Sequence, residues 1–355
     1  MAATEYGVNH PLAIKKWEPE LMKEALKKTY ALQFMSKSKS SICTIKTDLT
    51  TSDGGDRIRV GIRNQLKGDG IRGDNTLEGN EESLETFYQD VFIDQLRHAV
   101  RSRGKMSEQR VPFSVREEAK DGLADWWSER IDRWFFNQLC GNTAQADDRY
   151  YGFNSPVAPD LDHVTFGNSG VTGATLAGGE GSLSNTTIAK MNLTFIDTAI
   201  EKAKLAKNAL RPVADGKYVM FLHPYQVTAL RTNTATGQWQ DIQKAAMSGG
   251  KVSDNPIFTG ALGIYNNVIL HESTRVPVSP NNANVYRAVL CGAQALCIAF
   301  GRKYGKNVFS WKEELFDYDN QLGVAAGCQA GMVKTRFDGS DYGTIVVPTY
   351  ATASV

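Results

Sequence analysis

The chain has 355 residues, of which 41% are apolar and 22% charged, a composition that is ordinary for a globular protein and excludes a disordered one. Lysine and arginine number 40 against 39 acidic residues, and the net charge of +1 lacks the basic excess of a dedicated nucleic-acid-binding protein. No window reaches about 18 consecutive apolar residues, so we expect no membrane span.

The N-terminal stretch, MAATEYGVNHPLAIKKWEPE, lacks a basic segment followed by an apolar core. We therefore expect no secretory signal and a protein that stays in the cytoplasm where it is made. Apolar residues at helical spacing then predict an amphipathic helix within Leu21–Met35, with Pro19 near its first turn.

The next segments predict a long β-hairpin. Ile58, Val60 and Ile62 alternate with arginines in GDRIRVGIRNQL, which indicates a strand with one polar face. A second extended segment is expected in ETFYQDVFIDQLRHAVRSRG, after a stretch rich in Gly and Asp. The end of this hairpin has too few apolar residues to bury itself within its own subunit.

The strongest helix signal runs from Ser114 to Leu139. Ser114 followed by Glu117 is a capping box, apolar residues recur at helical spacing, and Gly141 provides a stop. At a rise of 1.5 Å per residue, such a helix would be about 39 Å long. Acidic residues interleave with its aromatic residues, so we interpret these as core or subunit contact rather than a base-stacking platform. They are Trp126, Trp127, Trp134, Phe135 and Phe136.

The remaining sequence mixes helices and strands. Tyr150–Ser184 is rich in Gly, Ser and Thr and is expected to be a long surface loop. A helix is predicted within 186–208, a buried strand in KYVMFLHP, and a helix beginning at Pro224. Further strands are expected in GIYNNVILHES, NVYRAVLCGAQALCIAFG and YGTIVVPTY. The pattern is α+β, without the regular alternation of a parallel doubly wound sheet.

A literal G-x-G-x-x-G occurs at Gly68, Gly70 and Gly73, the spelling of a dinucleotide-binding fingerprint. The strand before it is half-exposed and rich in arginine, and Asp69 and Asp74 would repel a pyrophosphate. We therefore predict that the glycines permit positive φ at a hairpin tip. A nucleotide-dependent oxidoreductase stays an alternative, which requires a helix beginning near Gly73.

Other chemical motifs are weak. His271 and Ser273 lie two residues apart without a nucleophile elbow, His223 is interpreted as a packed or capping residue, and Asp147–Asp148 lacks metal-site spacing. We predict no catalytic, metal or cofactor-binding residues and therefore no enzyme. The five scattered cysteines are expected to be reduced and buried; they are Cys43, Cys140, Cys291, Cys297 and Cys328.

Several segments together resemble a known family. They are DLTTSDGGDRIRVGIRNQLKGDGIRGDNTLEGNEESL, IDQLRHAV, REEAKDGLADWWSERIDRWFFNQLCG, MFLHPYQVTALR and FTGALGIYNNVILHES, spread over roughly Trp17 to Phe300. The chain is similar to the major capsid proteins of tailed bacteriophages, in the N-four-like podovirus subgroup.

The resemblance implies the Hong Kong 97 phage-type capsid fold, an α+β architecture. It implies an N-terminal arm at 1–47 and an extended β-hairpin loop at 48–103. A peripheral domain would follow at 104–185, with the spine helix at 114–139 and a Gly-rich surface loop. An axial domain would occupy 186–270, and strands in 271–355 would return to the peripheral domain.

The implied function is structural. Copies would self-assemble into pentamers and hexamers of an icosahedral shell enclosing double-stranded DNA, assembled in the host cytoplasm and forming the virion capsid. Scaffolding, portal and decoration proteins are expected partners, and a membrane is not. An encapsulin-like nanocompartment shell is the alternative within the same fold.

We expect the extended loop to lie on a neighbouring subunit, where its charges would pair across the interface at about 0–1 kcal/mol for each exposed pair. These charged residues are Arg57, Arg59, Arg63, Asp69, Arg72, Asp74, Glu78, Glu81 and Glu82. The basic residues of the arm are interpreted first as a solvated helix face, and they are also the candidates to meet DNA phosphates without reading sequence. They are Lys15, Lys16, Lys23, Lys27 and Lys28.

Overall fold

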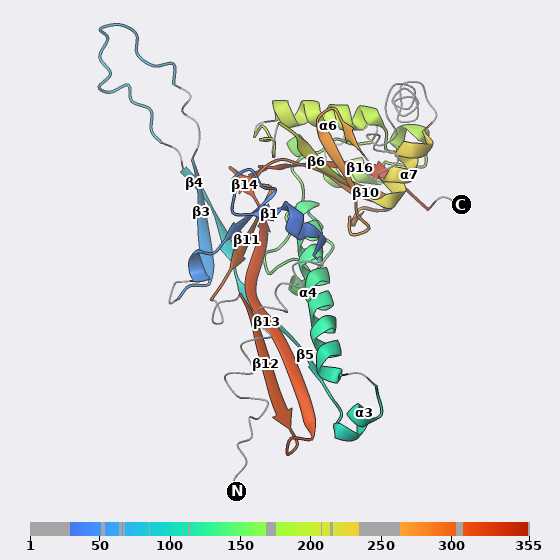
Figure 1. Ribbon diagram of the computed structural model, residues 1–355. Coiled ribbons are helices and arrows are strands. Elements are labelled where there is room, and N and C mark those ends of the chain that lie inside the picture. The colour runs from blue at the N-terminus through green and yellow to red at the C-terminus, as the bar shows by residue number, and fades with distance from the viewer. Residues whose placement is uncertain are drawn as a thin grey trace, which may run out of the picture.

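The computed structural model describes most of the chain, in the ranges 29–50, 54–63, 66, 68–84, 86–112, 114–167, 175–206, 208–213, 216–233, 263–302 and 308–353. Figure 1 shows three parts, which are a long lower unit around α4, an upper unit around α6, and a hairpin that reaches away from both. None of the described helices is both long enough and apolar enough to cross a membrane.

The lower unit is built on a mixed sheet. Within the described ranges its strands run in the spatial order β1 (Met35–Ser36), β2 (Cys43–Lys46), β11 (Leu296–Phe300), β13 (Gln321–Lys334) and β12 (Phe309–Phe316), and β5 (Asp94–Arg101) also pairs with β13. The long β13 organises the sheet, because β12 and β5 pair antiparallel with its first part and β11 with its last. The short helix α3 (Lys105–Gln109) follows β5 at the far end of the unit.

The long helix α4 (Val115–Leu139) packs on this sheet. Of the predicted capping box, the structure shows the half made by Ser114, whose hydroxyl accepts the main-chain N–H of Glu117 at 3.4 Å. Gly141 follows its end with a φ of 60°, where glycine avoids strain. Four of its aromatic side chains are at most 1% exposed: Trp127, Trp134, Phe135 and Phe136. The interpretation of these four residues as core is confirmed, whereas Trp126 is partly buried and packs against the same core.

The upper unit holds a second sheet. Among the described residues its spatial order is β16 (Thr344–Tyr350), β10 (Asn282–Cys291), β6 (Tyr218–Leu222), β8 (Val268–Glu272) and β7 (Ile264–Tyr265), and β9 (Val278–Ser279) pairs with β10. The predicted buried strand is β6, which is buried along its whole length. The helices α6 (Leu193–Leu205) and α7 (Pro224–Thr232) pack on this sheet. The predicted capping role of His223 is confirmed, since its Nδ1 accepts the N–H of Tyr225 at 3.3 Å.

The C-terminal segment contributes to both units. The resemblance implies that strands within 271–355 join the unit of the long helix, and β11, β12 and β13 lie in that sheet. In contrast, β10 and β16 pair with each other, and β10 pairs with β6, in the upper sheet. The apolar side chains of β10 and β16 complete the core beneath α6, which explains why these strands stay with the upper unit.

Short elements fill the remaining segments. The region expected to be a long loop over Tyr150–Ser184 contains the 3-10 helix η4 (Leu161–His163) and α5 (Leu176–Gly181). Of the helix expected at Leu21–Met35, the residues before 29 lie outside the described ranges, and Tyr30–Phe34 forms the 3-10 helix η1. The other short elements are η2 (Asp48–Thr50), η3 (Asp148–Tyr150), η5 (Thr187–Ala189), β14 (Arg336–Phe337) and β15 (Ser340–Asp341).

A buried ion pair fastens α5 between the two units. The Arg287 guanidinium on β10 donates to both carboxylate oxygens of Glu180 on α5, at 2.6 and 2.9 Å. It also donates to the carbonyl of Gly141, just beyond α4, at 2.7 Å. Arg287 thus links the upper sheet to the end of α4, and the Gly-rich region supplies, through Glu180, the carboxylate that pairs with its buried charge.

Candidate assembly surface

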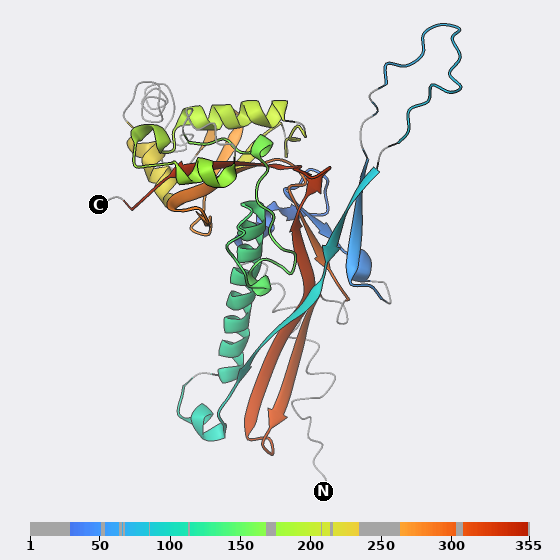
Figure 2. The same ribbon diagram turned by 180° about the vertical axis from the view of Figure 1, so that it is seen from behind.

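The hairpin consists of β3 (Arg57–Arg63) and β4 (Thr86–Phe92), which pair antiparallel along their length. At its base, the side chains of Ile58 and Val91 are 6% and 0% exposed and pack against β11 and β13. These contacts agree with the predicted strand with one polar face. Figure 2 shows β4 running on into β5, so that the hairpin continues directly into the lower sheet.

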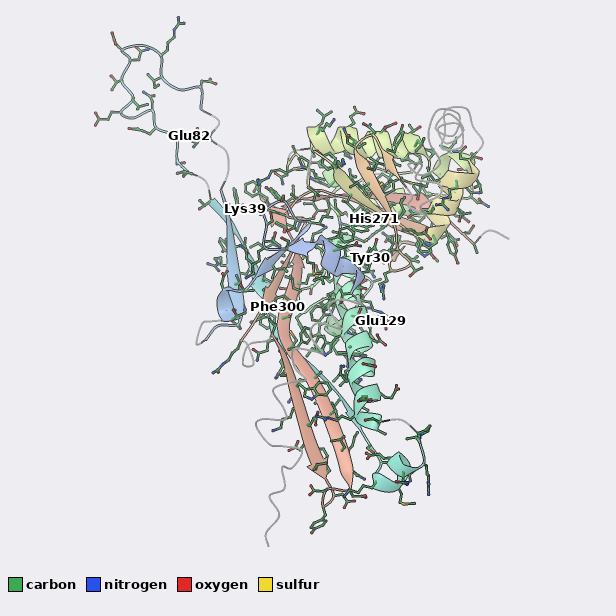
Figure 3. All side chains as sticks on the ribbon, in the orientation of Figure 1. Tyr30, Lys39, Glu82, Glu129, His271 and Phe300 are labelled. Carbon is green, nitrogen blue, oxygen red and sulfur yellow. The ribbon has the colours of Figure 1, made fainter. Side chains whose placement is uncertain are left out.

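Beyond the paired strands, residues 68–84 form an exposed loop of turns. Gly70 and Gly73 have φ values of 73° and 67°, which confirms the predicted reason for glycine at these two positions. Residues 68–84 contain no helix, so the motif lacks the element that a dinucleotide fingerprint requires. Figure 3 shows Glu82 on this loop, away from the two units.

Two of the predicted contact residues hold the loop itself together. The carboxylate of Glu82 accepts a hydrogen bond from the N–H of Gly68 at 2.7 Å, across the loop. Glu81 accepts one from the N–H of Gly79 at 2.8 Å. Their carboxylates thus shape the loop within one subunit. The other charged residues of the loop are exposed, and they are Asp69, Arg72, Asp74 and Glu78.

The arginines of the strands have partners in their own hairpin. The guanidinium of Arg59 donates to both carboxylate oxygens of Asp90, its cross-strand neighbour, at 2.7 and 2.9 Å. It also lies 4.0 Å from the ring centroid of Tyr88. The hydrogen bond from Arg59 lowers the pKa of Asp90. Arg57 lies 3.9 Å from Asp56, with its side chain 62% exposed.

Some predicted residues cannot be placed. Arg63 belongs to β3, but its side chain is outside the described part of the chain. The lysines predicted to face DNA also lie outside it; they are Lys15, Lys16, Lys23, Lys27 and Lys28. The structure therefore places the predicted loop charges on one exposed hairpin and leaves the arm without a position.

Exposed apolar side chains on the hairpin are the feature that sequence reasoning missed. Leu66, Leu77 and Leu84 are 58%, 62% and 59% exposed, Tyr88 is 66% exposed and Ile71 39%. Complete burial of one such side chain contributes roughly 1.5–3 kcal/mol, more than an exposed ion pair at about 0–1 kcal/mol. The sequence signal is faint because each leucine stands singly in a polar stretch, outside any periodic pattern.

The other residues considered as chemical motifs have packing or pairing roles. His271 lies among aromatic rings, 5.1 Å from Phe34 between centroids, and burial lowers its pKa. Asp147 pairs with Arg149 at 2.7 Å. All five cysteines are free and buried as predicted, and burial raises the pKa of Cys140 to about 12. Within the described ranges, no group of three or more His, Cys, Asp and Glu residues could hold a metal ion.

Comparisons with known proteins cover nearly the whole chain. A family model described as phage capsid protein matches residues 5–353. The major capsid protein of Pseudomonas phage KPP25 is 26% identical over 362 residues, covering 93% of each protein. The capsid structure of Ralstonia phage GP4 is similar with 32% identity and a TM-score of 0.75 over 99% of both chains. The capsid of cyanophage Pam1 matches with a TM-score of 0.76 and 19% identity, covering 100% of this chain and 95% of that one.

Proposed function

Because the chain belongs to the phage capsid protein family, it is a structural protein of the virion shell, and we propose that its copies associate as pentamers and hexamers. It has the α+β Hong Kong 97 phage-type capsid fold. The proposed shell is icosahedral, assembles in the host cytoplasm and encloses double-stranded DNA.

The two units correspond to the two domains of such a subunit. The lower unit, with α4 along β13, is the proposed peripheral domain and α4 its spine helix. The upper unit, with α6, α7 and the sheet around β6, is the proposed axial domain, which meets its copies at the centre of a pentamer or hexamer. β10 and β16 are assigned to this axial domain, because they share its sheet and its core.

The exposed hairpin carries the proposal that neighbouring copies meet through the extended loop. A subunit alone leaves the leucine side chains of this loop in water, although each would gain free energy by burial. A second copy provides the surface on which they are buried. The loop charges then pair at the rim of the contact, where they favour one register over others. Since Glu81 and Glu82 already bond main-chain N–H groups of their own loop, the exposed Asp69, Asp74 and Glu78 are the carboxylates that reach the neighbour.

Other partners follow from the proposed shell. Packaged DNA would be met through phosphates by basic residues of the arm, and scaffolding, portal and decoration proteins would complete the particle. An encapsulin-like compartment is the second candidate, and the comparisons with phage capsids favour the phage shell over it.

The test is assembly of the full chain expressed alone, followed by negative-stain electron microscopy and sedimentation velocity. We expect closed shells or rings of five or six copies from the wild type. The double substitution Leu77→Ser, Leu84→Ser should leave folded subunits that do not assemble. Met106→Ser, on α3, where this side chain is 65% exposed, is the control and should assemble. Normal shells from the loop variant would contradict the proposed contact, and a shell of encapsulin size would favour the second candidate.

A further inference from the structure

The hairpin leaves the lower sheet at one identifiable point. The ladder between β5 and β13 runs up to the pair Asp94 and Ala330. Beyond it, β4 pairs only with β3 among the described strands, and the two form a separate two-stranded sheet. Gly331, the next residue of β13, lies so close to β4 that a Cβ built on it would be 1.9 Å from the carbonyl oxygen of Phe92. Main-chain pairing between β13 and the hairpin therefore stops where the two strands cross closely.

Past this crossing, a side-chain amide on the hairpin replaces the ladder. The Nε2 of Gln89 donates to the carbonyl of Lys334 at 2.7 Å. Its Oε1 accepts the main-chain N–H of Arg336 at 2.9 Å. One side chain thus satisfies a donor and an acceptor of the body, as a residue of a neighbouring strand would.

A second amide acts in the opposite direction, from the body to the hairpin. The Oδ1 of Asn154 accepts the N–H of Phe92 at 3.0 Å, and its Nδ2 donates to the carbonyl of the same residue at 2.9 Å. Phe92 is the last residue of β4, so this pair of bonds fixes the base of the hairpin. Asn154 belongs to the segment that follows α4.

A third side-chain amide, on α4 itself, bonds the main chain of both Asn154 and Lys334, which contact the hairpin. Gln138 is 0% exposed, one residue before the end of the helix. Its Nε2 donates to the carbonyls of Tyr151, at 2.8 Å, and Asn154. Its Oε1 accepts the N–H of Lys334 at 3.3 Å. The end of the spine helix is therefore connected to the hairpin in two ways. One runs from Gln138 through Asn154 to Phe92, and the other from Gln138 through Lys334 to Gln89.

We propose that Gln138, Asn154 and Gln89 form an amide relay that sets the direction in which the extended hairpin leaves the subunit. The apolar contacts at the base, such as the edge-to-face pair of Phe87 and Phe337 with centroids 4.9 Å apart, supply attraction without a fixed direction. Paired amide hydrogen bonds are directional, because each requires a near-linear geometry at a defined atom. The three residues are positioning residues for assembly.

The relay couples the hairpin to the end of α4. A movement of this end carries Gln138 with it, and Gln138 is hydrogen-bonded to Asn154 and Lys334, the two residues whose bonds reach the hairpin. The inference rests on the proposed function, since the direction of the loop has a consequence only where it meets a neighbouring copy. It adds to that function the residues that aim the loop.

The test measures the direction of the hairpin in unassembled full-length subunits. Spin labels are attached to cysteines introduced at Ser83 and at Asp121, both exposed, and the native cysteines are buried and therefore protected from labelling. Pulsed electron paramagnetic resonance then gives the distribution of distances between the hairpin and α4. Gln89→Leu and Asn154→Ala are compared with Gln109→Leu, a matched change at an exposed position of α3.

We expect Gln89→Leu and Asn154→Ala to broaden or displace the distance distribution, with circular dichroism unchanged, and Gln109→Leu to leave it as in the wild type. A role in stability alone would lower the thermal midpoint without changing the distribution. An unchanged distribution in both relay variants would overturn the inference. Because the distance is measured without assembly, it separates this failure from that of the proposed function, which shows instead as a wild-type chain that forms no shells.

Discussion

Replacing Glu180 with alanine would leave the guanidinium of Arg287 buried without its carboxylate. Glu180 is 0% and Arg287 1% exposed, so no water reaches the pair to screen the charge that remains. The substitution removes two charge-assisted hydrogen bonds, at 2.6 and 2.9 Å, and keeps the neutral acceptors of the guanidinium, the carbonyls of Cys140 and Gly141. Loss of one partner from such a pair lowers the free energy of unfolding by about 3–5 kcal/mol.

The assay is urea unfolding of the unassembled subunit, followed by tryptophan fluorescence. The control is Glu129→Ala, which removes the i,i+4 partner of Arg133 on the surface of α4, where both side chains are about half exposed. This control should lower the free energy of unfolding by only about 0.3–0.5 kcal/mol. Equal, small losses in the two variants would refute the reasoning that burial of the pair joins α5, α4 and the upper sheet.

Three further predictions concern backbone, pH and assembly. Gly331→Ala forces a Cβ against a main-chain carbonyl of β4 and should lower the free energy of unfolding by roughly 1–3 kcal/mol. Gly122→Ala, in open space on α4, should instead raise it by about 1 kcal/mol, and thermal unfolding compares the two. Burial lowers the pKa of His163 from 6.5, so the folded state disfavours its protonation and stability should fall as the pH drops below 6.5. Burial also lowers the pKa values of His223 and His271. His163→Leu should therefore weaken, but not abolish, the pH dependence of the free energy of unfolding, measured by urea unfolding at several pH values. Glu81→Lys with Glu82→Lys removes the hydrogen bonds to the N–H groups of Gly79 and Gly68 that shape the exposed loop. This variant should block assembly while leaving the subunit folded, and normal shells in sedimentation velocity would argue against it.

Elements with a cap, a periodic apolar pattern or a short apolar run in their own sequence were predicted correctly. The helix α4 follows from the cap at Ser114 and from apolar spacing, and β6 from a short apolar run. β13 escaped prediction because its sequence, QLGVAAGCQAGMVK, is rich in Gly and Ala, which favour strands weakly. Its strand conformation comes from pairing on both sides, with β12, which precedes it across a short turn, and with β11 and β5, which lie farther away in sequence.

The position of the exposed hairpin was predicted from the sequence, but its internal contacts were not. The charges of the hairpin mark it as exposed, yet a sequence cannot show that Arg59 faces Asp90 across the ladder or that Glu82 reaches the N–H of Gly68. Single leucines such as Leu77 are ambiguous in sequence, since only the folded chain shows which of them stay in water. The division of 271–355 between two sheets likewise depends on long-range pairing, which carries no local signal.

The most direct test of the account is electron cryomicroscopy of shells assembled from this chain, with the path of the extended loop traced from β3 to β4. We predict that the loop lies on an adjacent copy and that the side chains of Leu66, Leu77 and Leu84 are buried against it. A loop that folds back on its own subunit, or that projects into solvent with these leucines uncovered, would contradict the account.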